Sequence, residues 1–210
     1  MRLLRKTIRK VILEEVCAGA TAKIQQGLDE IEKRNFMIAV DIFREGGYDI
    51  ELRKRLPKGL SQVIGQYEVG TSRLCKAAYI TQWTEIDPTL QKTGIGAVLY
   101  DVAIEVATQL GGYLACDRSA VSDQAKRMWR YYDASDDYDQ LQFDTWNGDY
   151  TEDDESDDCK QTVFHRDEGI SWDSDPASYK EKFMASPFTK AYRKKQITTI
   201  PCLGDRYTES

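Results

Sequence analysis

The stretch that decides the fold is Ile86-Asp87-Pro88-Thr89-Leu90-Gln91-Lys92-Thr93-Gly94-Ile95-Gly96-Ala97. Residues 74–86 before it (LCKAAYITQWTEI) have the composition of a long strand, and residues 95–110 after it carry apolar side chains at helical spacing. N–H groups at the start of a helix have no intrahelical partner, and glycines let an anion approach them closely. The stretch therefore predicts a strand, a phosphate-binding turn and a helix.

The same stretch resembles the signature of the GNAT family of N-acyltransferases. Its residues in register with that signature are Ile86, Pro88, Gln91, Gly94 and Gly96. The elements around it also follow the family order, since a short strand is expected at 113–116 and a helix, with Ser122 as N-cap, at 121–132. The resemblance implies an α/β (α+β) GNAT fold, in which helices flank a central mixed, twisted sheet and parallel strands splay apart at the cofactor site.

The resemblance implies that the cofactor is acetyl-CoA or another short acyl-CoA. The pantetheine arm would pair with the end of the long strand, at Trp83, Thr84 and Ile86. The pyrophosphate would lie at the turn, where the expected binding residues are Gln91, Lys92, Thr93, Gly94, Ile95, Gly96 and Ala97.

Two other nucleotide-binding motifs are excluded. A dinucleotide-binding Rossmann motif requires a third glycine where Leu99 stands, and a P-loop requires Gly-Lys followed by Ser or Thr, which is absent. No metal site is expected.

Acyl transfer to an amine needs a base for the amine and an acid for the departing thiolate. The resemblance implies a tyrosine acid on the helix after the short strand, but Trp129 stands at the family position. Tyr132, nearly one turn further on, is the candidate acid. Glu85 is the candidate base, with Glu68 as an open alternative. A core role for Tyr132 and proton transfer through ordered water also remain open.

Two further nucleophilic or basic residues are expected to be structural. His165 lies between Phe164 and Arg166 at the end of an expected strand, 162–165. A nucleophilic role for Cys116 would require an activating base that the sequence does not supply, so a small buried residue is the better interpretation.

The composition limits the function classes further. The net charge of −6 argues against general nucleic-acid binding, and no apolar run approaches the length of a membrane span. Five scattered cysteines without a C-x-x-C pair indicate neither a disulfide framework nor zinc, and the first residues do not resemble a signal peptide. We therefore expect a cytoplasmic protein without a membrane partner.

The organisation expected along the chain has four parts. Residues 1–34 form N-terminal helices, the second of which (21–34) packs through Ile24, Leu28 and Ile31. Residues 35–148 form the GNAT core, with strands at 36–43, 48–52 and 60–69. Residues 149–160 are an acidic loop, and 161–210 are a strand and an aromatic-rich tail that complete a single domain.

The acidic loop has three interpretations. It lacks the spacing of an EF-hand. It is a solvated loop, a clamp for a cationic acceptor, or a tether for a basic partner or for the basic residues 1–10 of the chain.

We expect an N-acyltransferase that transfers an acyl group, by direct attack within a ternary complex, to an amine of a protein, a small molecule or a modified nucleobase. Residues 1–10 and 121–132 look like those of tailed-bacteriophage GNAT-like proteins, which implies a host bacterial cytoplasm. The alternative is a catalytically silent GNAT fold that serves as a binding or virion-associated protein. Neither the acceptor nor the oligomeric state follows from the sequence.

Overall fold

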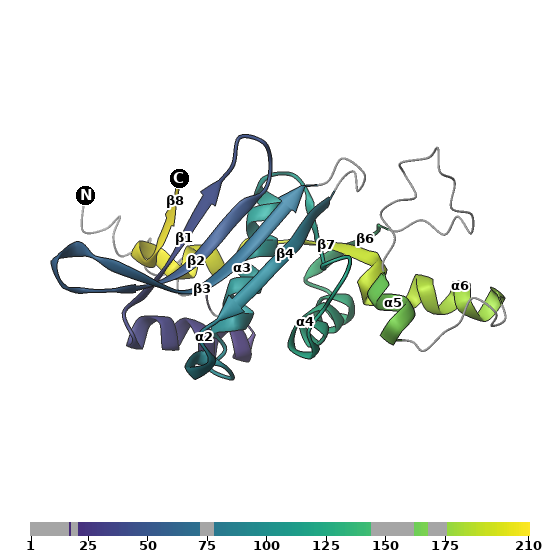
Figure 1. The fold of residues 1–210 in the computed structure, drawn as a ribbon, viewed down its shortest axis with the longest axis horizontal. Helices are drawn as coiled ribbons and strands as arrows, with labels where there is room; N and C mark the ends of the chain where they lie inside the picture. The colour runs from purple at the N-terminus through teal and green to yellow at the C-terminus, as the bar shows by residue number, and fades with distance from the viewer. Residues whose placement is uncertain (1–16, 18–20, 72–77, 144–161, 168–175) are drawn as a thin grey trace. The chain divides into compact units, whose positions relative to one another are not determined.

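The computed structural model describes residue 17 and residues 21–71, 78–143, 162–167 and 176–210. In this part of the chain the strands form one mixed sheet of order β6-β7-β5-β4-β3-β2-β1-β8, with helices beside it (Figure 1). The strands are β1 Phe36–Ile42, β2 Tyr48–Arg55, β3 Ser61–Thr71, β4 Ala78–Ile86, β5 Tyr113–Ala115, β6 Tyr138–Gln142, β7 Lys190–Lys194 and β8 Tyr207–Glu209. The helices are α2 Ala22–Lys33, α3 Ile95–Gln109, α4 Asp123–Ala134, α5 Thr162–Asp167, α6 Pro176–Ala185 and α7 Thr199–Leu203. The mixed α/β class expected from the sequence is confirmed.

The chain divides into two compact units, each described by itself. The first unit comprises the described residues of 1–68, 84–105 and 196–210, and the second those of 69–83 and 106–195. Strands β3 and β4 contribute residues to both. The domain boundaries expected from the sequence stay predictions.

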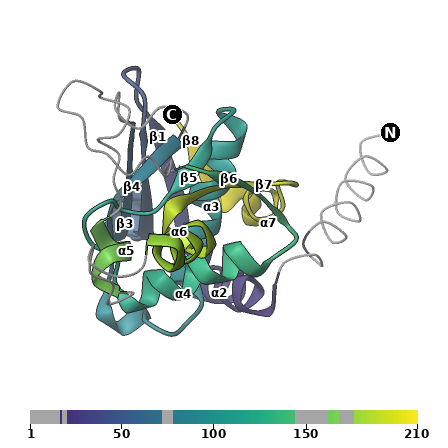
Figure 2. The same ribbon diagram turned by 90° about the vertical axis from the view of Figure 1, so that its right-hand side faces the viewer.

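The first unit is built on the β1–β2 hairpin. The strands pair from Phe36↔Lys54 to Ile42↔Tyr48, and Gly46 and Gly47 form the turn with φ of 91° and 92°. Strand β8 lies parallel to β1. Alternation along the first five residues of β2 completely buries Tyr48, Ile50 and Leu52. Figure 2 shows α2, α3 and α7 together on one side of β1 and β3.

Tyr48→Phe is expected to destabilise the first unit. The fully buried Tyr48 hydroxyl donates a 2.6 Å hydrogen bond to the carbonyl of Ala103 in α3, which links the sheet to the helix. Loss of a buried hydrogen bond of this kind costs about 1–2 kcal/mol. Urea denaturation measures the change, and a midpoint equal to that of the wild type would contradict this contact.

Helix α2 matches its prediction closely. It begins after Thr21, whose side chain accepts a hydrogen bond from the amide of Ile24, and it buries Ile24, Leu28 and Ile31 as expected. The first N-terminal helix predicted for the chain lies outside the described residues, apart from Cys17.

The second unit places β5 between β4 and β7. β5 pairs with β4 in parallel, from Ala78↔Tyr113 to Ile80↔Ala115, and with β7 antiparallel, and β6 pairs with β7. Helix α4 begins after Ser122, whose hydroxyl accepts from the amide of Ala125, as predicted. In sequence β7 follows α6 by only a short turn, η3 Pro187–Thr189.

The strand predicted at 162–165 is wrong, because these residues belong to helix α5. A short apolar run does not distinguish a strand from a buried helix turn. Here tertiary packing decides: Phe164 lies edge-on to Tyr179 and Phe183 of α6, with ring centroids 5.5 and 5.2 Å away. The expected acidic segment, residues 149–160, lies outside the described residues.

The expectation of no disulfide is also wrong. Cys17 and Cys202 form a disulfide bond across a sequence separation of 185 residues. Residue spacing gives no signal for such a pair, since α7 is brought to α2 only by the tertiary fold, where these two helices are in contact.

Candidate functional site

The turn after β4 is built from local hydrogen bonds. Asp87 caps the short helix η2 Pro88–Leu90 by accepting from the amide and the hydroxyl of Thr89, at 2.9 and 2.7 Å. These donors lower the pKa of the Asp87 carboxyl below its ordinary value, with the Thr89 hydroxyl contributing most. The Asp87 amide in turn donates to the carbonyl of Ile64 in β3. The end of β4 and the start of the turn are thereby fixed.

The backbone of residues 91–96 forms a glycine-bearing turn that leads into α3. Lys92 and Gly94 have positive φ, 66° and 87°, and α3 begins at Ile95. Two of the seven residues expected at the pyrophosphate donate their amides within the turn, Gln91 to the carbonyl of Pro88 at 3.3 Å and Thr93 to that of Leu90 at 3.4 Å. Within the described residues the other amides, those of Lys92, Gly94, Ile95, Gly96 and Ala97, donate to no backbone carbonyl.

Helix α2 forms the wall behind this turn. A Cβ added to Gly27 would lie 2.5 Å from the carbonyl oxygen of Gly94, and one added to Gly94 would lie 2.6 Å from that of Lys23. The two backbones therefore touch directly, and glycine is required on both sides. Gly27 is a site residue that the sequence did not predict, because its only local signal is a glycine inside a helix.

The two glycines of the turn have different roles. Gly94 is buried against α2, so its absent side chain serves packing as well as backbone conformation. Gly96 is partly exposed, and a Cβ there would meet only the Ile86 side chain, at 3.3 Å. Gly96 is thus the residue whose missing side chain leaves the amides accessible.

The last residues of β4 alternate in exposure. Trp83 is 56% exposed and Glu85 is exposed, whereas Thr84 and Ile86 are partly buried. The Thr84 hydroxyl oxygen is buried and makes no hydrogen bond to any residue that the structure describes. An unpaired buried hydroxyl costs free energy unless a ligand satisfies it.

The parallel pairing of β4 and β5 ends early. The last pair is Ile80↔Ala115, and β4 continues to Ile86. After β5 the chain turns at Asp117, whose carboxylate accepts from the amides of Ser119 and Ala120 at 2.6 and 3.1 Å. The backbone groups on the β5 side of residues 81–86 are therefore not part of this ladder.

Tyr132 lies in the second unit and is completely buried. Its ring packs against Trp129, Tyr138 and Tyr192, with centroids 5.6, 4.7 and 6.0 Å away. These are the surroundings of a core aromatic residue, and the role of general acid stays a prediction. Glu85 belongs to the first unit.

The remaining candidates are distributed over the chain. Glu68 on β3 accepts a 3.0 Å hydrogen bond from Gln66. Burial, and then the charges of Glu68, Glu51 and Asp41, raise the pKa of the neighbouring Asp49. Buried Cys116 has its sulfur 3.5 Å from the carbonyl of Phe188, which agrees with a structural role, and the side chain of His165 lies outside the described residues.

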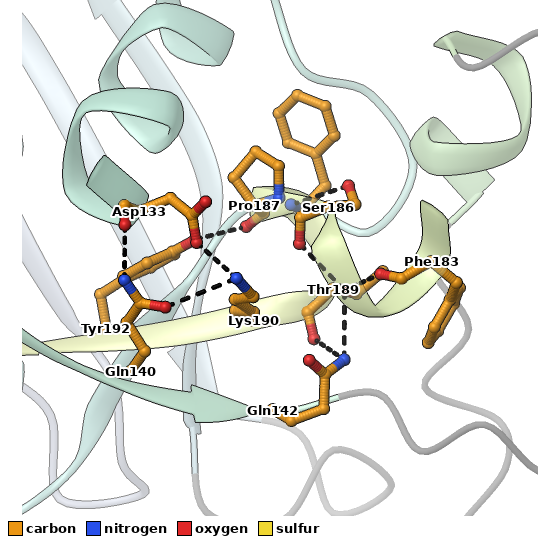
Figure 3. Close-up of polar contacts among 10 residues, drawn as sticks. Asp133, Gln140, Gln142, Phe183, Ser186, Pro187, Thr189, Lys190 and Tyr192 are labelled. Atoms are coloured by element: carbon orange, nitrogen blue, oxygen red, sulfur yellow. Dashed lines mark hydrogen bonds and ion pairs between the residues drawn. The ribbon is translucent and has the colours of Figure 1, made fainter. Parts of the chain in front are cut away.

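A polar network that the sequence did not suggest joins α4, β6 and β7 (Figure 3). Lys190 donates to Asp133 at 2.6 Å, and the Tyr192 hydroxyl lies 3.3 Å from the same carboxylate and 2.9 Å from the carbonyl of Pro187. Burial and the charge of Asp133 raise the pKa of Tyr192 far above its ordinary value. Tyr192 therefore stays neutral, and the network holds β7 against α4.

In the described residues no group of His, Cys, Asp and Glu side chains is suited to hold a metal ion, and no helix is long and apolar enough to cross a membrane. Comparison of this chain with protein-family models, curated proteins and solved structures finds no match. The turn at residues 91–97 and the end of β4 are therefore the features that bear on function.

Proposed function

We propose that this chain is an acyl-CoA-dependent N-acyltransferase of the GNAT type, with acetyl-CoA as the donor and an amine as the acceptor. The observation that carries the proposal is the set of amides at residues 92 and 94–97, where β4 leads into α3, which donate to no backbone carbonyl in the described part of the chain. A helix N-terminus with unpaired N–H groups favours an anion, and a pyrophosphate would satisfy several of these donors at once.

The residues of this region fit the parts of coenzyme A. The turn amides suit the pyrophosphate, and the exposed Lys92 adds a positive charge beside them. The backbone of β4 past Ile80 suits the amide groups of the pantetheine arm, which pair as a strand would. The buried Thr84 hydroxyl supplies a further donor or acceptor that lacks a protein partner.

The proposed reaction requires the protein to position two substrates and to transfer two protons. Binding holds the thioester and the amine together, which supplies much of the rate enhancement in transfer reactions of this kind. Exposed Glu85 accepts the amine proton directly or through water, and Tyr132 is the proposed proton donor to the thiolate. The acyl group passes directly to the amine, without an enzyme-bound intermediate.

A catalytically silent GNAT fold is the second candidate. It is favoured by Trp129 at the position of the family tyrosine, together with the complete burial of Tyr132. Such a protein would bind the coenzyme through the same turn and would not transfer the acyl group.

A thermal melt with acetyl-CoA tests the proposal. At about 100 times its dissociation constant a ligand adds about 2.7 kcal/mol of stability, which raises the melting temperature of a chain of this size by about 5–10 °C. Coenzyme A should act similarly, and pantetheine, which lacks the pyrophosphate, should give a much smaller shift. No shift with any short acyl-CoA would contradict both candidates.

A thiol-release assay over a panel of amines then separates the enzyme from the silent protein. Release that is lost in Tyr132→Phe or Glu85→Gln, with acetyl-CoA binding retained, would support their catalytic roles. Binding without release of thiol by any amine would favour the silent protein.

Thr84→Val is expected to stabilise the free protein and to weaken coenzyme binding. Valine has the shape of threonine but removes a buried hydroxyl that has no partner, a gain of about 1 kcal/mol for the free protein. If that hydroxyl bonds to the pantetheine arm, its loss weakens binding by about five- to tenfold. Calorimetric titration with acetyl-CoA, combined with urea denaturation, measures both changes.

The matched control is Thr93→Val, because the Thr93 hydroxyl donates a 2.6 Å hydrogen bond to the carbonyl of Leu90. This substitution should destabilise the free protein. Unchanged affinity in Thr84→Val would remove Thr84 from the proposed site.

A further inference from the structure

The Cys17–Cys202 disulfide bond links the chain just before α2 to α7, and α2 packs against the turn at residues 91–96. Cys17 precedes Thr21, the N-cap of α2, and Cys202 lies in α7. Helix α2 contacts the turn through Gly27 and Gly94, and α3 begins at the end of the same turn. Helix α7 is also attached to α3. The disulfide bond therefore joins the two helices that lie against α3 and the turn before it.

The attachment of α7 to α3 is strong. The fully buried Glu105 of α3 accepts hydrogen bonds from the amides of Thr198, Thr199 and Ile200, at 2.6, 2.7 and 2.7 Å. The Thr199 hydroxyl also donates to Asp101, one turn earlier in α3. Helix α7 is thus firmly held on α3, and the disulfide bond from Cys202 restrains Cys17 through it.

The N-terminal part of α2 supports the turn directly. Buried Ile24, Leu28 and Ile31 hold the helix on the first unit. Its N-terminal part is where Lys23 and Gly27 contact Gly94. The disulfide lies beyond this N-terminal end, so it restrains the same part of α2 that supports the turn.

We propose that the Cys17–Cys202 disulfide is a reversible redox switch, called the latch below. Its redox state sets how stably α2 packs against the turn at residues 91–96 and keeps the amides of that turn available to a ligand. Both cysteines are partly exposed, so a thiol can reach the bond, whereas Cys116 is buried. A low-molecular-weight thiol or a dithiol reduces the bond, and the reductant is oxidised to its disulfide. Two electrons and two protons pass to the protein, which leaves Cys17 and Cys202 as thiols.

Reduction removes the crosslink without breaking the apolar contacts of α2. The N-terminal part of α2 then unfolds locally more often, and during each such opening the turn loses its contact with Lys23 and Gly27. Oxidation by a disulfide compound restores the bond. The coenzyme affinity follows the redox state, a consequence that rests on the function proposed above.

Hydrogen exchange tests the latch without any ligand. Peptides that cover residues 21–27 and 92–97 should exchange about threefold or more faster in the reduced wild type than in the oxidised wild type. The melting temperature should fall by about 5–10 °C on reduction. Cys17→Ser and Cys202→Ser should behave as the reduced protein under both conditions, and Cys159→Ser should respond to reduction as the wild type does.

Calorimetric titration with coenzyme A gives the second measurement. The dissociation constant should be about five- to tenfold higher in the reduced protein, as a less ordered site binds more weakly. If exchange of residues 92–97 is identical in both redox states, or if Cys17→Ser still responds to reduction, the latch is wrong. If exchange responds but coenzyme A binds in neither state, the latch stands and the proposed acyltransferase function fails.

Discussion

Gly94→Ala is expected to destabilise the protein by about 3–5 kcal/mol, a large part of the total stability of an ordinary domain. Two effects add. The backbone at Gly94 has φ +87°, which costs a residue with a Cβ about 1 kcal/mol or more. The new Cβ would also lie 2.6 Å from the carbonyl oxygen of Lys23 and 2.7 Å from the amide nitrogen of Gly27, so α2 must move. Urea denaturation and the melting temperature measure the change.

The matched control for this prediction is Gly111→Ala. Gly111 has a similar φ of +79°, but a Cβ there meets nothing within 4 Å. Its expected cost is about 1 kcal/mol, the conformational effect alone. Equal losses in the two variants would show that α2 does not pack on the turn as described.

Gly27→Ala examines the same contact from the other side. Inside a helix this substitution ordinarily stabilises by about 1 kcal/mol, because alanine is the better helix former. At Gly27 the added Cβ would lie 2.5 Å from the carbonyl oxygen of Gly94. A net loss of stability, opposite in sign to the helix propensity, is therefore expected.

Glu105→Gln is expected to cost about 3–4 kcal/mol and to release the C-terminal segment from α3. Both carboxylate oxygens accept backbone amides of residues 198–200, and the residue is completely buried. Glutamine replaces one acceptor by an NH₂ group, which would then face an amide donor. Hydrogen exchange of residues 198–210, which include β8, should rise in this variant.

Glu32→Gln is the control for Glu105→Gln. Its side chain is 72% exposed and lies 3.4 Å from Arg206, and exposed pairs of this kind contribute little. The expected loss is within about 0.5 kcal/mol. If Glu105→Gln were as mild, the C-terminal segment would be held by other contacts than those to Glu105.

Several elements could be predicted from the local sequence, because they depend on interactions between near neighbours in the chain. The apolar spacing of α2, the caps Thr21 and Ser122, and the strand–turn–helix at residues 86–96 all follow from interactions between near neighbours in sequence. The open-amide turn could be predicted for the same reason, since its glycines and the helix that follows are local features.

Other elements could not be predicted, because they depend on contacts between residues that are distant in sequence. Phe164 lies in a helix because α6 offers Tyr179 and Phe183, and the network around Asp133 requires Lys190 and Tyr192 from β7. Strand β6 was missed because it lies in an acidic stretch and gains its partner only from β7. Neither pairing leaves a local signal in the sequence.

The sequence by itself determined a mixed α/β protein with a glycine-bearing turn between a strand and a helix, because conformational preference and hydrophobic spacing act over a few residues. Only the tertiary structure decided that Gly27 backs that turn, that Glu105 caps α7, and that Cys17 meets Cys202. These contacts join residues far apart in the chain. Their geometry is set by how whole helices pack, and no local pattern encodes it.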